Sequence, residues 1–106
     1  MSEPKIDFFH TNDCHTWKIS LKDLEEVLKE EKIDAKINVQ LVETQEQADR
    51  FKFTGSPTII INEKNVDPTS REQKNFVLLG CRLYFYKGKS FEFPPKEMIK
   101  DALKER

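Results

Sequence analysis

The chain opens with a strand that leads directly into an amphipathic helix, and this pairing constrains the fold more than any other feature. The apolar run KIDFFH (residues 5–10) predicts a buried strand, and the turn-like TND (11–13) follows it. A helix is expected from near Cys14 to near Lys32, because apolar residues recur there at helical spacing. Its apolar face consists of Trp17, Leu21, Leu24, Val27 and Leu28.

A second strand is expected directly after this helix. Apolar and polar residues alternate in AKINVQLVE (35–43), so Ile37, Val39 and Leu41 share one face. Two strands joined by a helix are expected to run parallel through a crossover connection.

The middle of the chain predicts a short helix, a strand and a loop. Thr44 and Gln47 have the spacing of a capping box, so the helix should begin there, run through Phe53 and stop near Gly55. Its buried residues would be Ala48 and Phe51. TIIIN (58–62) is rich in β-branched residues and predicts a strand. The polar stretch 62–75 predicts a loop that contains at most a short irregular helix.

The last third predicts one more strand and a final helix. FVLLGCRLYFY (76–86) is the expected strand, with a bend at Gly80, and a turn follows at 87–89. Pro94-Pro95 opens the helix, because proline is tolerated in a first helical turn. The apolar stripe of this helix is Ile99, Ala102 and Leu103.

These elements predict an α/β fold in the order β-α-β-α-β-β-α. The expected architecture is one domain spanning residues 1–106, with a four-stranded mixed sheet and helices on both faces.

The composition argues against several classes of function. The net charge is −1 and no basic block stands out, which argues against a nucleic-acid partner. We expect no membrane association and a cytoplasmic protein, because the sequence has no apolar run of membrane-spanning length and no signal-peptide pattern. Two cysteines, Cys14 and Cys81, are too few for the disulfide framework of a secreted scaffold.

Three local features resemble the thioredoxin-like superfamily. Cys14 lies between the first strand and the first helix in TNDCHTW, a Ser-Pro pair opens the third strand in FTGSPTIII, and a charged helix closes the chain. The passage GSPTIIINEKNVDP, with GCRLY downstream, is also similar to small thioredoxin-like proteins that carry C-x-x-W or C-x-x-C after strand one. The resemblance covers nearly the whole chain and implies a cis-proline at Pro57 beside an active cysteine.

Trp17 departs from the dithiol pattern of that superfamily. It occupies the place of the second cysteine in C-H-T-W, so a disulfide between positions 14 and 17 is impossible. Cys14 is the candidate catalytic nucleophile, because a helix N-terminus stabilises the reactive thiolate. Asp13 would oppose that stabilisation, whereas a protonated His15 would add to it.

Five residues around Cys14 and the Ser-Pro pair are the expected substrate contacts. Ser56 would present its backbone to an extended substrate beside Pro57. Trp17 fits core packing through the helix stripe and also fits a partly exposed substrate contact. The complete set is His15, Thr16, Trp17, Ser56 and Pro57.

Cys81 and the histidines offer further chemistry that the sequence favours less. If the third and fourth strands pair antiparallel, Cys81 lies away from Cys14, beyond the ~7 Å Cα separation of a disulfide. A buried structural role is favoured for Cys81, although the loop over 63–75 leaves a resolving role open. His10, Cys14 and His15 could ligate zinc or copper, but their spacing matches no standard motif, so we expect no metal site.

Two functions follow. The first is a single-cysteine thiol–disulfide oxidoreductase without a bound cofactor, which uses glutathione or another small thiol as co-substrate. The second is a non-catalytic module that binds a partner protein through the groove around Trp17 and Pro57. Metal or metalloid handling stands behind both.

Overall fold

The computed structural model describes residues 4–12, 16–71, 73–74, 76 and 83–104. The elements in chain order are β1 (Ile6–His10), α1 (Trp17–Glu30), β2 (Ile37–Leu41), α2 (Gln45–Phe51), β3 (Thr58–Ile61), β4 (Lys64–Asn65), the 3-10 helix η1 (Pro68–Ser70), β5 (Tyr84–Tyr86), β6 (Lys89–Phe91) and α3 (Lys96–Lys104).

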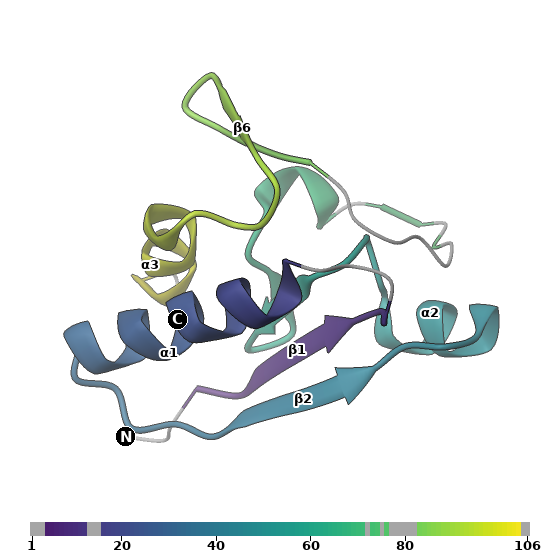
Figure 1. Ribbon diagram of the computed structural model, residues 1–106, viewed down its shortest axis with the longest axis horizontal. Helices are drawn as coiled ribbons and strands as arrows, with labels where there is room; N and C mark the ends of the chain where they lie inside the picture. The colour runs from purple at the N-terminus through teal and green to yellow at the C-terminus, as the bar shows by residue number, and fades with distance from the viewer. Residues whose placement is uncertain (1–3, 13–15, 72, 75, 77–82, 105–106) are drawn as a thin grey trace.

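The main sheet has four strands in the order β2-β1-β3-β4 (Figure 1). β1 runs parallel to β2 and antiparallel to β3, and β3 runs antiparallel to β4. The parallel pair confirms the predicted crossover through α1. This mixed four-stranded sheet gives the chain a thioredoxin-like topology and confirms the predicted fold class.

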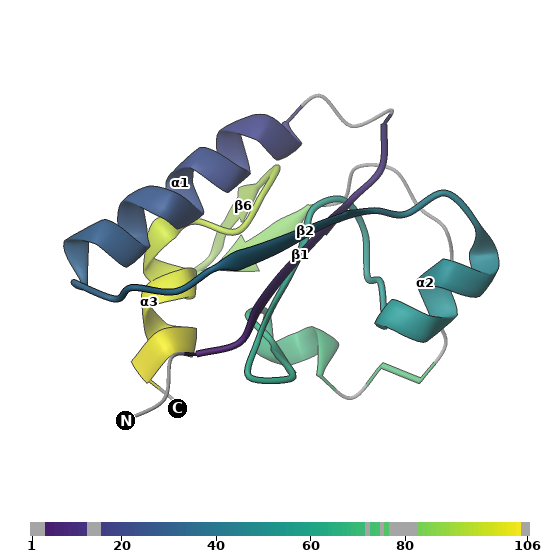
Figure 2. The same ribbon diagram turned by 90° about the horizontal axis from the view of Figure 1, so that it is seen from below.

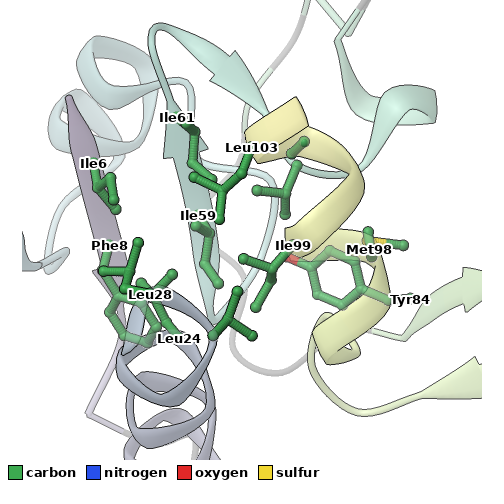
Figure 3. Close-up of a cluster of buried hydrophobic side chains, with 13 residues drawn as sticks. Ile6, Phe8, Leu24, Leu28, Ile59, Ile61, Tyr84, Met98, Ile99 and Leu103 are labelled. Atoms are coloured by element: carbon green, nitrogen blue, oxygen red, sulfur yellow. The ribbon is translucent and has the colours of Figure 1, made fainter. Parts of the chain in front are cut away.

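Helices cover both faces of the sheet, as predicted (Figure 2). α1 and α3 lie on one face and bury a large cluster against β1 and β3 (Figure 3). α2 lies on the other face, over a smaller cluster. The large cluster consists of Ile6, Phe8, Leu24, Val27, Leu28, Ile59, Ile61, Val66, Tyr84, Met98, Ile99, Ala102 and Leu103, and the smaller one of Phe9, Val42, Ala48, Phe53 and Ile60.

A group of ion pairs joins α1 to α3. Lys96 Nζ lies 2.8 Å from Glu26 Oε1 and 3.8 Å from Glu30 Oε2, and Lys100 Nζ lies 2.9 Å from Glu30 Oε1. The hydrogen bond from Lys96 lowers the pKa of Glu26, and that from Lys100 lowers the pKa of Glu30. Ion pairs therefore link the charged faces of α1 and α3, and these faces are also exposed to solvent.

The capping box of α2 is present as predicted, but the end of the helix was predicted wrongly. Thr44 Oγ1 accepts a hydrogen bond from the Gln47 backbone, and the Gln47 side chain accepts from the Thr44 backbone. The helix ends at Phe51, because Lys52 adopts a left-handed conformation with φ 56° and reverses the chain before Gly55. Phe53 lies beyond the helix and is fully buried.

The fourth strand of the sheet is not the predicted one. It is β4, two residues within the stretch 62–75 that was predicted as a loop. In the stretch 76–86, the described strand is β5, which pairs with β6 in a separate hairpin across the predicted turn. Gly80 lies outside the described residues.

None of the helices in the described part of the chain is both long and apolar enough to cross a membrane.

Candidate functional site

The carboxyl end of β1 and the amino end of β3 lie side by side at one end of the sheet. Phe9 pairs with Thr58 there, which brings the residues after β1 beside the Ser-Pro pair that precedes β3. The Thr11 backbone N–H donates to Ser56 Oγ over 3.0 Å. The first residue after β1 is therefore bonded to the residue that precedes Pro57.

The Ser56–Pro57 peptide bond is cis, as the resemblance to thioredoxin-like proteins implied. The Tyr84 hydroxyl donates a hydrogen bond to the Pro57 carbonyl, and Tyr84 is fully buried. Ser56 is 0% exposed and Pro57 is also buried. Both residues are therefore part of the protein interior.

His10 and Trp17 form a stacked pair across the loop between β1 and α1. Their ring centroids lie 3.7 Å apart with an interplanar angle of 11°. His10 is 6% exposed, whereas Trp17 is half-buried and packs against the large core cluster. Lys18 Nζ lies 5.7 Å from the centre of the indole ring. Trp17 therefore packs on the core, as its stripe position predicted, and keeps part of its surface exposed.

Thr16 is the N-cap residue of α1. Its carbonyl accepts a hydrogen bond from the Ser20 backbone over 3.1 Å, and its side chain makes no capping bond. Within the described part of the chain, the buried hydroxyl oxygens of Thr11 and Ser20 have no hydrogen-bond partner. Thr11 after β1 and Ser20 in α1 thus contribute two buried hydroxyls close in sequence to the predicted nucleophile.

Cys14 and His15 lie outside the described residues, as does Cys81. Their predicted roles as nucleophile, substrate contact and structural or resolving thiol remain predictions. Of the weighed metal ligands, only His10 is described, and no group of three or more metal-ligating side chains gathers among the described residues.

Two members of this site were missed from the sequence. The sequence suggests His10 only as a metal ligand, and its spacing from Trp17 gives no helical or strand signal for their contact. Tyr84 stands out in the sequence only as a member of an apolar run. Its hydroxyl was the available signal, because a buried tyrosine usually has a hydrogen-bond partner.

The order and directions of the strands give the chain a thioredoxin-like α/β topology, and a cis-proline directly precedes β3. The chain belongs to the family described as "Domain of unknown function (DUF2703)", whose sequence model matches residues 5–103. No curated protein matches the chain.

Proposed function

We propose that the protein is a single-cysteine thiol–disulfide oxidoreductase with Cys14 as its nucleophile. The observations that carry the proposal are two contacts made by residues on either side of Cys14 in the sequence. Thr11, before Cys14, is bonded to Ser56, and Trp17, after it, is stacked on His10. A thiolate held between a strand end and a helix start would benefit from the unpaired N–H groups of the first helical turn.

The reaction needs an external thiol, because Trp17 stands where a dithiol enzyme has its second cysteine. The Cys14 thiolate attacks one sulfur of a disulfide, which forms a mixed disulfide and releases the other sulfur as a thiolate. Glutathione thiolate then attacks the sulfur that came from the substrate. That step forms a glutathione mixed disulfide with the substrate and regenerates the Cys14 thiolate. A reducing cytoplasm would supply the glutathione.

The first test is the rate of iodoacetamide alkylation of each cysteine against pH, followed by mass spectrometry on the native protein. The proposal expects Cys14 to react fast, with a midpoint well below the ~8.5 of a free thiol. Cys81 serves as the internal comparator. A Cys14 that titrates like an ordinary thiol would contradict the first step of the mechanism.

Turnover of a small disulfide with glutathione as reductant is the second test. Activity should be lost in Cys14→Ser and kept in Cys81→Ser. Activity kept in Cys14→Ser, or activity no higher than background in the unsubstituted protein, would reject the enzyme.

The alternative is a non-catalytic module that binds a partner protein through the groove around Trp17 and Pro57. Ser56 and Pro57 are buried, so the contact with a partner would fall to Trp17, which keeps part of its surface exposed. A slowly reacting Cys14 without turnover is the outcome that supports it.

A further inference from the structure

β2 is an edge strand with an uncovered side. It pairs with β1, and the part of the chain that the structure describes provides no strand on its other side. Figure 1 shows β2 as the outermost strand, and Figure 2 shows it from its free side, between α1 and α2. The sequence of β2, INVQL, contains neither a proline nor a charged residue, two of the devices by which edge strands are kept from pairing.

One hydrogen bond shows which backbone groups of β2 point toward β1 and which point to its free side. Val42 N–H donates to the His10 carbonyl over 2.8 Å, so Val42 faces β1. In a parallel ladder, successive residues direct their backbone N–H and C=O groups to opposite sides of the strand. The backbone groups of Ile37, Val39 and Leu41 therefore point to the free side. The Gln40 side chain donates to the Leu41 carbonyl over 3.0 Å, which agrees with that carbonyl having no partner in the sheet.

The side chains of β2 divide by chemistry between the two faces of the sheet. Ile37 and Val39 line a groove of about 550 Å³ between β2 and α1. Asn38 and Gln40 line a groove on the α2 face. Val39 is 42% exposed, which makes it one of the few large apolar side chains on the described surface.

This pattern is self-complementary about Val39. In an antiparallel pair of two β2 strands centred on Val39, Val39 would face its own copy and Ile37 would face Leu41. On the other face, Asn38 would face Gln40. The outward backbone groups of all three apolar residues would point at the partner strand, as hydrogen-bonded pairs require.

We infer that two copies of this chain pair through their β2 edges into one continuous eight-stranded sheet. The interface is isologous, because the same five residues contribute from both copies. The rim of the α1-side groove is electrically balanced, so two copies can approach without net repulsion. Its charged residues are Glu25, Lys29, Lys32 and Asp34. This inference does not depend on the chemistry of Cys14.

Sedimentation equilibrium over a range of protein concentrations tests the dimer. The unsubstituted protein should show a monomer–dimer equilibrium. Val39→Lys should weaken the dimer ~10-fold or more, because it places two like charges opposite each other at the two-fold axis. Ile19→Lys is the matched control, because Ile19 is 53% exposed on α1 and should leave the dimer intact. A monomer at every concentration, or equal effects of both substitutions, would overturn the inference.

A cross-linking experiment tests the register without relying on a destabilising change. In a Cys14→Ser, Cys81→Ser background, Val39→Cys should form a disulfide-linked dimer on mild oxidation. The Cα atoms of a hydrogen-bonded antiparallel pair lie about 5.5 Å apart, within the range of a disulfide. Gln40→Cys should cross-link much more slowly, because Gln40 would face Asn38. Equal rates for the two variants would reject the register.

Discussion

The hydroxyl of Tyr84 donates a hydrogen bond to the carbonyl of Pro57, 27 residues earlier in the chain. Tyr84 is the first residue of β5, and Pro57 directly precedes β3. The bond thus connects the β5–β6 hairpin, which lies outside the main sheet, to the end of the sheet where the candidate site lies. Together with the burial of Tyr84 in the large core cluster, this bond holds the hairpin on the core.

Tyr84→Phe should destabilise the protein by about 1–3 kcal/mol, because the buried Pro57 carbonyl loses its donor while the ring stays in place. The measurement is the free energy of unfolding in urea. Tyr86→Phe is the control, because that hydroxyl bonds Asp101 at an exposed site and its loss should cost less. Equal costs for the two substitutions would count against the Tyr84–Pro57 bond.

Trp17→Ala should destabilise the protein by about 2 kcal/mol, because it removes a half-buried ring from the core and from the His10 stack. Trp17→Phe keeps an aromatic ring and should cost less. A double-mutant cycle between His10 and Trp17 should give a coupling energy of about 0.5–1.5 kcal/mol in urea unfolding. A coupling energy near zero would show that the stack contributes nothing in solution.

The ion pairs between α1 and α3 predict an acid-dependent loss of stability. The lysine partners lower the pKa values of Glu26 and Glu30 below 4.5. Because these pKa values are lower in the folded state, the stabilisation is present above pH 4.5 and is lost as the pH falls through the folded-state values. Lys96→Met should therefore lower the melting temperature at neutral pH, and the difference from the unsubstituted protein should disappear in acid.

High salt should shrink the same difference at neutral pH, because these side chains are solvent-exposed and screened. Lys87→Met is the control, since it removes a longer exposed contact to Glu97 at 3.5 Å. A Lys96→Met deficit that persisted unchanged in acid and in salt would have to come from lost packing of the lysine stem instead.

Tyr86 should titrate well above an ordinary tyrosine. Its hydrogen bond to the Asp101 carboxylate raises its pKa from 10.0 to about 12. The protonated phenol is favoured in the folded state, so this stabilisation is present below pH 10.0 and is lost as the pH rises through about 12. The measurement is the near-ultraviolet absorbance of tyrosinate, compared with that of Asp101→Ala, in which the pKa should return toward 10.0.

The titration can be assigned because the chain has only two tyrosines, Tyr84 and Tyr86. Tyr86→Phe leaves the signal of Tyr84, and the difference between the curves belongs to Tyr86. An unchanged midpoint in Asp101→Ala would show that the carboxylate does not hold the phenol.

The first half of the fold could be predicted because its signals are local. The helical spacing of Leu24 and Leu28 and the alternation around Val39 each lie within one element. A crossover helix then leaves little freedom in how β1 and β2 pair. The same locality explains why the capping box at Thr44 was recognised.

The prediction for the second half of the fold was wrong where strand pairing depends on tertiary contacts. β4 has only two residues, Lys64 and Asn65, which are too few for any periodicity. Tyr84 lies in an apolar run that suits a central strand, yet its strand pairs within a hairpin. At the candidate site, the Ser-Pro motif identified Pro57, whereas the contact of His10 with Trp17 joins the ends of two different elements and has no sequence pattern.

The two faces of the sheet are unequally supported. Among the residues that the structure describes, the cluster under α1 and α3 has 13 buried members and the cluster under α2 has five, and Ala48 is the only buried residue of α2 itself. We therefore expect α2 to open and reclose locally while β1 and β3 stay paired. In hydrogen exchange, the amides of α2 should exchange through local opening, whereas those of β1 should exchange only when the whole protein unfolds.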